Sequence, residues 1–441
     1  MLLRFSTFLF LFALAVIFEA SSLTVEVTQG NIKPIPIALL PFQSQDPDKE
    51  LYAKKIVEQV HKDLSETGLF KILPESSFLE NPKRMGDVPR FSDWRVLEVQ
   101  GVVTGKIIPS NYGSLRLEFR LWDAFRERQI EGKALVGPQN SWRKIAHKIS
   151  NYVYQRLIGE PGHFDTKIAY VSESYPNTKK NKRRLAIMDF DGHNHFYLTN
   201  DKTIVLTPRL SPTKPELVFM SYENNTPQVY ILNFKTNKRR KLGDFPGMTF
   251  APRFSPLGDK IIFSQSINGL SSIYEMTLKN NHLKRLTRSP SIDTSPSYSP
   301  DGKQIVFNSD RSGSKQLYVM NSDGSNIHRI SFGEGRYSTP VWSPRGDLIA
   351  FSKSHKGTFY IGVMKPDGTA ERWISSGYVV EAPSWSPNGR LLMYTRETKG
   401  DKSNPGGKSY VMLVDVTGNK TKIMKTPKQG SAPDWSINSI F

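Results

Sequence analysis

A repeat of about 44 residues constrains the fold of this chain more than any other feature of its sequence. Six times, an aromatic residue or a leucine stands directly before a serine, with a proline two residues before that aromatic residue or leucine. The six serines are Ser211, Ser255, Ser299, Ser343, Ser386 and Ser436, separated by 44, 44, 44, 43 and 50 residues. A period of this length, with four short strands in each unit, is typical of β-propeller blades.

Residues 295–331 show what each unit contains. Apolar runs at residues 305–307 and 317–320 alternate with turn sequences such as Asp323-Gly324, which predicts a small antiparallel sheet. One such sheet leaves both faces wet, so it needs stacked copies for stability. A second marker, an apolar triplet such as Tyr318-Val319-Met320, also recurs six times and predicts six blades.

The two ends of the repeat array are offset from each other. The first unit begins at residues 166–171 without the proline-containing strand that opens the others, and the chain finishes on such a strand at residues 432–436. The C-terminal strand is therefore predicted to complete the first blade and close the ring, which removes an exposed sheet edge. The predicted fold is an N-terminal α/β domain at residues 23–160, followed by a closed six-bladed β-propeller at residues 161–441.

The first 22 residues are predicted to be a signal peptide. Arg4 precedes an apolar run at residues 5–18, and small residues at positions 20–22 fit a cleavage site after Ser22. The alternative is a membrane anchor, but the run falls short of the ~20 apolar residues that a span needs. We expect the protein to be exported and to have no membrane span in its mature form.

The region after the signal peptide alternates helical and strand patterns. We expect strands at residues 36–42, 70–73, 101–108, 115–122 and 129–136, and helices at residues 48–67, 94–99 and 141–157. Gly68 is expected to end the first helix and Ser141 to cap the last one. Residues 23–33, with alternating β-branched side chains, are either an added strand or a mobile N-terminal arm.

Composition limits the classes of partner. The chain has 60 Lys and Arg against 41 Asp and Glu, a net charge of +19, which favours acidic partners through long-range attraction. Much of this charge stands in predicted turns, where a solvated surface is the ordinary explanation. No nucleic-acid-binding motif occurs, and nucleic acid is not an expected partner of an exported protein. The chain has no cysteine, so no disulfide is available.

The sequence offers no catalytic or metal-binding pattern that stands up to inspection. Residues 101–106 lack the spacing and the Ser or Thr of a phosphate loop. Residues 189–192 lack the remaining ligands of a calcium loop, and His193 and His195 have no partners at zinc-ligand spacing. No G-x-S-x-G nucleophile motif occurs. We therefore expect neither an enzyme nor a bound cofactor or metal.

A docking surface is expected where the loops between blades surround one end of the ring. These loops mix aromatic or Met side chains with charged ones, as the core and rim of a protein interface do. The predicted partner-binding residues are Met248, Thr249, Phe250, Ala251, Asp293, Thr294, Arg336, Tyr337, Tyr378 and Glu381. For each of them the alternative is packing between blades.

The blade pattern at residues 296–302, continuing through residues 309–313 to 318–321, resembles the WD40-like repeat of TolB, of prolyl oligopeptidases and of the tricorn protease. The junction at residues 159–171, with residues 36–42, 101–106 and 121–123, is similar to the TolB family in particular. The departures are local: residues 213–215 and 257–258 alter the Asp-Gly turn, and residues 436–437 lack the usual Ser-Pro.

This resemblance implies a periplasmic component of the Tol-Pal system that supports outer-membrane integrity and constriction at cell division. It implies that the lipoprotein Pal docks on the propeller and that the inner-membrane-anchored TolA binds the N-terminal arm, with Leu23, Val25, Val27 and Ile32 as contacts. Other envelope proteins are further candidate partners. Two alternatives from other classes stay open: a propeller-containing peptidase or hydrolase, and a propeller that binds an anionic glycan.

Overall fold

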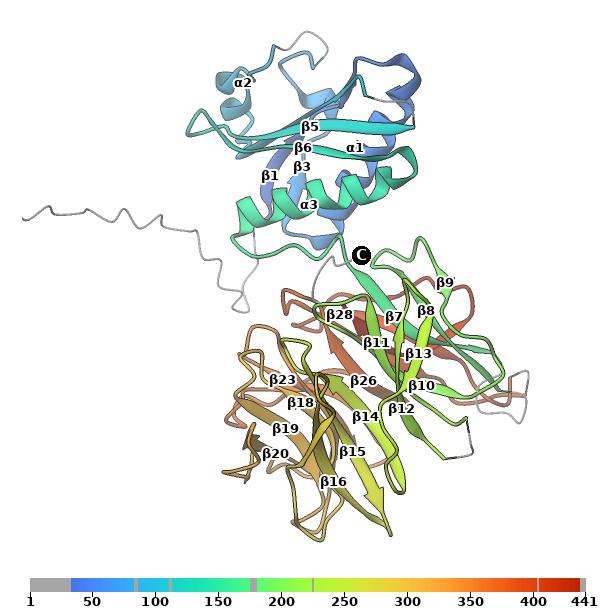
Figure 1. Cartoon of the computed structure of the whole chain (residues 1–441). Coiled ribbons are helices and arrows are strands. Elements are labelled where there is room, and N and C mark those ends of the chain that lie inside the picture. Colours follow the sequence, from blue (N-terminus) through green and yellow to red (C-terminus); the bar gives the residue numbers. More distant parts are fainter. Residues whose placement is uncertain are drawn as a thin grey trace, which may run out of the picture.

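The computed structural model describes residues 33–82, 86–110, 113–174, 181–223, 226–402 and 404–436, and shows two domains in contact (Figure 1). The predicted signal peptide and the arm residues Leu23, Val25, Val27 and Ile32 lie outside the described residues. No helix in the described part of the chain has both the length and the hydropathy needed to cross a membrane.

The N-terminal domain is a mixed sheet with two helices on one face. Its elements are β1 (Ile35–Leu39), β2 (Gln43–Ser44), η1 (Pro47–Lys49), α1 (Glu50–Thr67), β3 (Phe70–Ile72), η2 (Glu75–Ser77), α2 (Phe91–Val96), β4 (Gly101–Ile108), β5 (Ser114–Asp123), β6 (Arg128–Pro138), η3 (Gln139–Ser141) and α3 (Trp142–Ile158). The strand order is β3-β1-β4-β5-β6, and β2 also pairs with β4. Strands β3, β1 and β4 run parallel, whereas β4, β5 and β6 are antiparallel.

Amphipathic patterns explain these elements. The apolar residues of α1 recur at Ile56, Val60 and Leu64, one turn apart, and are fully buried against the sheet and α3. Gly68 ends α1 with φ 71°, in the left-handed region that glycine occupies without strain. Helix α2 begins three residues earlier than predicted. Ser141 stands at the N-cap of α3 as predicted, but its side chain makes no capping hydrogen bond.

The C-terminal domain has six four-stranded antiparallel sheets, which confirms the predicted six-bladed propeller. Grouped by sheet, the strands are β30 (Gln429–Trp435), β7 (Lys167–Ser174), β8 (Lys182–Asp189) and β9 (Phe196–Tyr197); β10 (Val205–Leu210), β11 (Glu216–Ser221), β12 (Gln228–Asn233) and β13 (Lys238–Lys241); β14 (Met248–Phe254), β15 (Lys260–Ile267), β16 (Leu270–Thr277) and β17 (His282–Arg285); β18 (Thr294–Tyr298), β19 (Gln304–Ser309), β20 (Gln316–Asn321) and β21 (His328–Arg329); β22 (Arg336–Trp342), β23 (Ile349–His355), β24 (Thr358–Met364) and β25 (Arg372–Gly377); and β26 (Val379–Trp385), β27 (Leu391–Glu397), β28 (Ser409–Asp415) and β29 (Thr421–Ile423).

The C-terminal strand closes the ring as the sequence predicts. β30 pairs antiparallel with β7, and Trp435 lies opposite Ile168. The backbone N–H of Ser436 donates to the carbonyl of Lys167 at 2.9 Å, and the indole Nε1 of Trp435 donates to Thr166 Oγ1 at 2.7 Å. The first blade is thereby built from both ends of the propeller sequence, so the ring has no free edge at the seam.

The proline of each repeat marks a bulge in the innermost strand. The residue before each proline has φ between 45° and 56°, and the pairing register shifts at that point in all six strands. The six residues are Thr207, Ala251, Ser295, Thr339, Ala382 and Ala432. Proline cannot donate to a sheet ladder, and a bulge is a position where no donor is needed.

The blades pack through one large aromatic side chain in each second strand. These six side chains are 0 % exposed: Tyr170, Phe219, Phe263, Phe307, Phe351 and Tyr394. Because they occupy equivalent positions in the repeat, they explain why every blade carries an apolar run there. This layer fixes the inner strands around the axis of the ring.

Candidate functional site: the two mouths of the propeller

The ring has two ends, which differ in what surrounds them. We call the end formed by the connections between first and second strands and between third and fourth strands the covered mouth, because the N-terminal domain contacts it. Its contacts come from Asp191 after β8, Arg345 after β22 and Arg390 after β26. In Figure 1 the N-terminal domain lies on this side, with α3 facing the propeller. We call the opposite end the open mouth.

A buried histidine holds the N-terminal domain to the covered mouth. His147 of α3 is 2 % exposed, and its Nδ1 donates to Asp63 Oδ2 of α1 at 2.7 Å. Its Nε2 lies 3.6 Å from Asp191 Oδ2 of the propeller, to which Arg143 Nη1 also donates at 2.8 Å. Burial by itself would lower the pKa of His147, but the two aspartates raise it to about 9. His147 is therefore a cation at neutral pH, held between carboxylates of both domains.

The same cluster has a composition that metal sites share, but its carboxylates are already paired. His147, Asp189 and Asp191 bring ligand atoms within 4.8 Å of one another. Arg143 pairs with Asp191, and Lys167 pairs with Asp189. A metal ion would have to compete with both cations, so we assign the cluster to the joint between domains.

Glu160 forms a second connection at the covered mouth. Its carboxylate accepts from Arg390 Nε at 2.5 Å and Nη2 at 3.0 Å, and from Arg345 Nη1 at 3.4 Å. A further contact joins Asn388 Nδ2 to Nδ1 of His163 at 3.3 Å. Burial lowers the pKa of His163 to about 3, so this second histidine is neutral. The N-terminal domain thus occupies the covered mouth at the blades that contain β8, β22 and β26, through buried and partly buried polar contacts.

Four of the predicted docking residues expose their side chains at the open mouth. Met248 is 43 % exposed and Tyr378 is 56 % exposed, and Arg336 and Glu381 are also exposed. They come from β14, β22, β26 and the loop before β26, so the closed ring brings together residues far apart in the sequence. Phe250, Ala251 and Thr294 are half-buried in the same inner strands.

The other three predicted residues support the open mouth from inside. Thr249 is 0 % exposed, and its Oγ1 accepts from the backbone N–H of Val229 at 3.1 Å. Asp293 is fully buried against Arg311 at 3.0 Å. Tyr337 is fully buried, and its hydroxyl donates to Glu371 at 2.7 Å. The alternative of packing between blades describes these three, which cannot be contact residues in this structure.

The sequence reasoning missed several exposed apolar side chains at the open mouth. Ile267 and Leu270 are 39 % and 49 % exposed, on either side of the two-residue turn between β15 and β16. Phe332, in the connection before β22, is 74 % exposed. The signal for the first pair was available, because Asn268-Gly269 is a tight hairpin turn with apolar neighbours that have no sheet to cover them.

Carboxylates gather at the centre of the open mouth. The side chain of Glu381 reaches solvent, but the protein around it removes part of its hydration, which raises its pKa. The nearby carboxylates of Glu397 and Glu173 also raise it. Glu173 is 2 % exposed and lies 3.5 Å from Arg183. The open mouth therefore combines exposed apolar side chains with acidic side chains, the arrangement that suits a partner with apolar anchors and hydrogen-bond donors.

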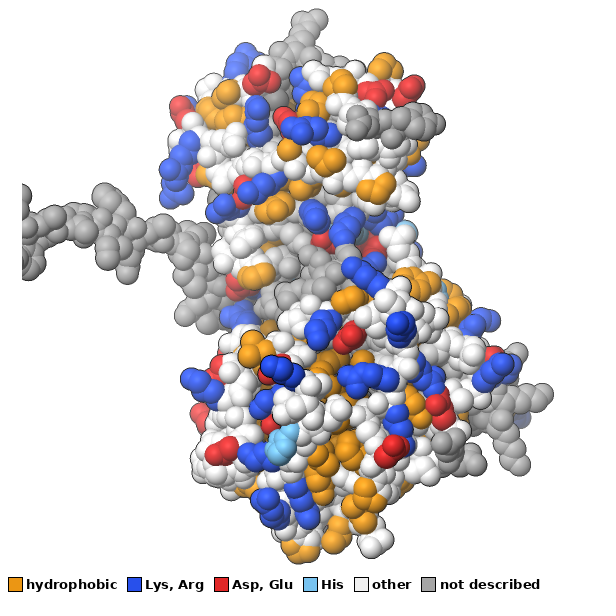
Figure 2. Space-filling view, viewed as in Figure 1, with side chains coloured by type: hydrophobic (Ala, Val, Ile, Leu, Met, Phe, Trp, Pro, Cys, Tyr) orange, Lys and Arg blue, Asp and Glu red, His pale blue; other side chains and the backbone are white. Residues whose placement is uncertain are grey.

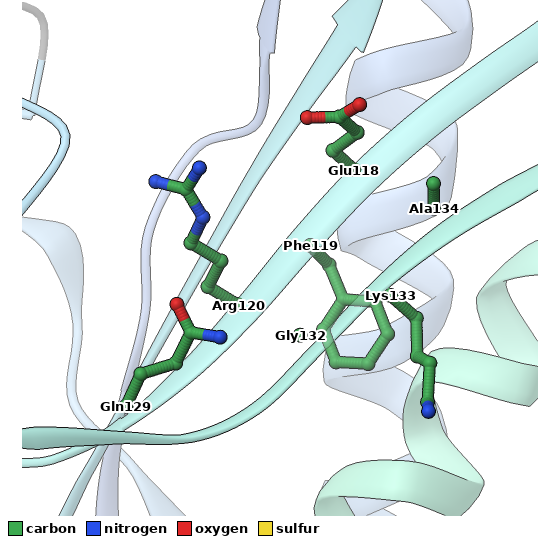
Figure 3. Close-up of a pocket in the computed structure, with 7 residues that line it drawn as sticks. All are labelled: Glu118, Phe119, Arg120, Gln129, Gly132, Lys133 and Ala134. Atoms are coloured by element: carbon green, nitrogen blue, oxygen red, sulfur yellow. The ribbon is translucent and has the colours of Figure 1, made fainter.

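A shallow groove on the N-terminal domain offers less. Figure 3 shows it between β5 and β6, lined by Glu118, Phe119, Arg120, Gln129, Gly132, Lys133 and Ala134. The ring of Phe119 belongs to the core beneath, and Lys133 lies over Tyr152 of α3 at 5.8 Å. Glu118 is paired with Arg116 at 3.0 Å. These side chains have local structural partners, and we assign no function to the groove.

Basic side chains are spread over the visible face of both domains instead of gathering in one patch, as Figure 2 shows. This distribution fits the ordinary explanation of the net charge, a solvated surface. It gives no support to an anionic glycan as the partner of this face, because such a ligand would need basic side chains in one place.

Comparison with known proteins places both domains. The family model described as TolB beta propeller domain matches residues 154–439, and the one described as TolB amino-terminal domain matches residues 23–130. The Tol-Pal system protein TolB of Paramagnetospirillum magneticum is 46% identical over 248 residues, 56% of this chain and 55% of that protein. That of Pelagibacter ubique is 48% identical over 260 residues, 56% of this chain and 57% of that protein. The chain thus spans little more than half the length of these relatives.

A solved structure agrees over a longer stretch. The crystal structure of TolB from Acinetobacter baumannii superposes with a TM-score of 0.77 at 25% identity, covering 92% of this chain and 97% of that chain. The names of the two relatives describe a component of the Tol-Pal system.

Proposed function

The chain belongs to the TolB family, and we propose that it serves the Tol-Pal system as a periplasmic docking protein without catalytic activity. In this proposal the open mouth of the propeller binds Pal, and the N-terminal arm binds TolA. The protein then links the outer membrane and peptidoglycan with the inner membrane, and supports outer-membrane integrity and constriction at division. The observation that carries the proposal is the contrast between a mouth partly covered by the chain's own N-terminal domain and a mouth where several apolar side chains are exposed.

The open mouth has the properties of an interface core. Met248, Leu270, Phe332 and Tyr378 are each between 43 % and 74 % exposed. Met248 and Leu270 stand on one blade, in β14 and β16, and the other two residues stand in two separate connections between blades. Aromatic and Met side chains are favoured as interface anchors, since they bury large apolar area on binding. The buried contacts of Thr249, Asp293 and Tyr337 keep the loops in place beforehand, which reduces the entropy lost on binding.

The remaining parts of the proposal rest on the sequence and on the family. An N-terminal apolar run after Arg4 supports export to the periplasm. The alternating residues Leu23, Val25 and Val27 support binding of the arm as an added strand. Removal of residues 23–32 from the mature protein should abolish TolA binding and leave the affinity for Pal within twofold if the arm and the open mouth are separate sites.

The proposal is tested by titrating purified Pal into the mature protein and two open-mouth variants, Met248→Lys and Tyr378→Ala. Each should weaken binding by tenfold or more, since loss of a central anchor costs about 2 kcal/mol or more. The matched control is Leu257→Lys: Leu257 is 77 % exposed, in the turn between β14 and β15 at the other end of the ring. Unchanged binding by both open-mouth variants, or an equal loss in the control, would remove the open mouth from the proposal.

A further inference from the structure

The six positions after the inner-strand prolines form a layer around the axis of the propeller. They are Arg209, Arg253, Ser297, Val341, Ser384 and Asp434. Each inner strand contacts the inner strands of the two neighbouring blades, so the six positions follow one another around the ring. The layer is chemically uneven: three members can accept a hydrogen bond, one is apolar and two are cations.

A common hydrogen bond explains what the acceptors do. The serine two positions after each layer residue donates to its own sheet, as Ser211 N–H does to Glu216 O at 2.8 Å. Along an antiparallel strand, only every second residue is hydrogen-bonded to the neighbouring strand. The N–H of the residue between the layer residue and the serine therefore points away from its own sheet. The side chain of the layer residue in the preceding blade accepts a hydrogen bond from this N–H. Leu210 N–H, for example, donates to Asp434 Oδ2 at 2.7 Å. The same bond joins Trp342 N–H to Ser297 Oγ at 3.3 Å and Trp435 N–H to Ser384 Oγ at 3.1 Å.

The two arginines break this pattern in adjacent blades. By the same repeat, Arg209 corresponds to the acceptor for the N–H of Phe254 in the next blade. Arg253 corresponds in the same way to the acceptor for the N–H of Tyr298. Both N–H groups point away from their own sheets, because Ser255 and Ser299 donate to Lys260 O and Gln304 O at 2.9 and 2.8 Å. A guanidinium only donates, so neither N–H has the side-chain acceptor that Leu210, Trp342 and Trp435 have. The N–H of Trp385, which follows the apolar Val341, lacks such an acceptor as well.

The charges of the layer do not balance either. Arg209 Nη1 donates to the carbonyl of Pro208 at 2.8 Å and lies 3.8 Å from Asp434 Oδ1. The side chain of Arg253 is partly buried, yet within the described ranges it makes no hydrogen bond or ion pair to a side chain or carbonyl. Burial, together with the smaller effect of the neighbouring Arg209, lowers the pKa of Arg253 to about 9, and Asp434 opposes this shift. Within this layer two guanidinium groups therefore share one carboxylate, Asp434, and stand next to two N–H donors.

We propose that this layer binds an oxyanion, a carboxylate or a phosphate, between Arg209 and Arg253, with the backbone N–H groups of Phe254 and Tyr298 as further donors. A group with two or more oxygens accepts from two guanidinium groups and supplies the acceptor that the neighbouring blades take from Asp434, Ser297 and Ser384. The ligand comes either as a free ion or as an acidic group of another chain that enters the ring. The two sources share this chemistry and are separated by the test. The site does not depend on the proposed binding of Pal.

The test variant is Arg253→Ser, which removes the unpaired cation and supplies the serine that the layer itself uses at two other positions. It is expected to fold, because the new hydroxyl can accept from Tyr298 N–H. The matched control is Arg240→Ser, which removes an exposed arginine of β13 from the outside of the same domain. Inorganic phosphate is titrated calorimetrically into the mature protein and both variants at pH 7 and constant ionic strength. The tripeptide Gly-Gly-Asp, which presents carboxylates on a peptide, is titrated in the same way.

Saturable binding of phosphate by the wild type and Arg240→Ser, weakened at least tenfold in Arg253→Ser, supports a free-ion site. Saturable binding of the tripeptide alone, with the same dependence on Arg253, supports a carboxylate delivered by a chain. Absence of saturable binding of both probes to the wild type, or equal binding to Arg253→Ser, overturns the proposal. If Arg253→Ser does not fold, Arg253→Gln replaces it and is judged by the same outcomes.

Discussion

The two mouths of the propeller are built from the same repeat, yet they differ in the burial of their charged and apolar side chains. At the covered mouth, ionised side chains from both domains are buried and paired, as His147 is between Asp63 and Asp191. At the open mouth, charged side chains such as Arg336 and Glu381 are exposed beside apolar ones. A buried ionic cluster costs free energy when broken, whereas an exposed apolar ring costs free energy until it is covered.

This difference indicates that the covered mouth is part of the joint between the two domains and that the open mouth is accessible to a partner. The joint at the covered mouth is favourable only while both domains stay together. At the open mouth Phe332 and Tyr378 stay 74 % and 56 % exposed, although the guanidinium of Arg329 lies over the ring of Phe332. The predictions below test that contrast with matched changes at the two ends, from the largest expected effect to the smallest.

Replacement of the buried histidine should have the largest effect on stability. His147→Ala leaves Asp63 and Asp191 without their shared cation, and breaking a buried ionic contact of this kind costs about 3–5 kcal/mol. His355→Ala is the matched change at the open mouth, where the ring lies 3.7 Å from Glu334, a side chain that is 81% exposed. It should cost about 1 kcal/mol or less. Urea unfolding of both variants measures the difference, and similar losses would erase the distinction between the mouths.

The pH dependence of stability should follow His147. Its pKa is raised from 6.5 to about 9 in the folded protein, so folding favours the protonated ring. The resulting stabilisation, about 3–4 kcal/mol, is fully present below pH 6.5 and is lost as the pH rises through about 9. The stability difference between the wild type and His147→Ala should therefore shrink between pH 6 and pH 9.5. A difference that stays constant would show that His147 is not charged.

The second connection at the covered mouth should contribute less. Glu160→Gln removes the charge that Arg390 and Arg345 share at a partly exposed position, and should cost about 1.5 kcal/mol. Glu334→Gln is the control at the open mouth, with an expected change within about 0.5 kcal/mol. Thermal unfolding at low and high salt compares the two. A larger loss for Glu334→Gln would reverse the assignment of the joint.

The smallest effect on stability is expected for Met248→Lys. Met248 is 43 % exposed, so its replacement should change the free energy of unfolding by about 0.5 kcal/mol or less. Tyr337→Ala, in contrast, should destabilise by about 3–5 kcal/mol, because this buried side chain fills the space between blades. Denaturant unfolding distinguishes the two. A strongly destabilised Met248→Lys would mean that this residue supports the blade and is not available for a partner.

Much of the fold was readable from the sequence because the repeat aligns the blades with one another. Pro433 and Trp435 indicated that the last strand belongs to the first blade, and their pairing with β7 confirms it. The roles of individual mouth residues were less accessible. Thr249 and Met248 are neighbours in the chain, but one points between blades and the other into solvent, since side chains alternate along a strand.

The joint and the arginine layer could not be predicted from the sequence. Asp63 and His147 are 84 residues apart, and nothing local marks either as half of a buried pair. Arg209 and Arg253 occupy repeat positions that hold serine in other blades. That substitution was visible, but its meaning depends on the direction of an N–H group in the next blade, which only the register of the sheets reveals.

The most direct test of the account is to place a photoreactive amino acid at Met248 or at Leu257 of the full chain in living cells and identify the crosslinked protein. Both positions are exposed. Met248 begins β14 at the open mouth, and Leu257 stands in the turn that follows β14 at the other end of the ring. The account predicts a crosslink to Pal from position 248 and none from position 257. A crosslink to Pal from position 257 with none from position 248 would contradict it.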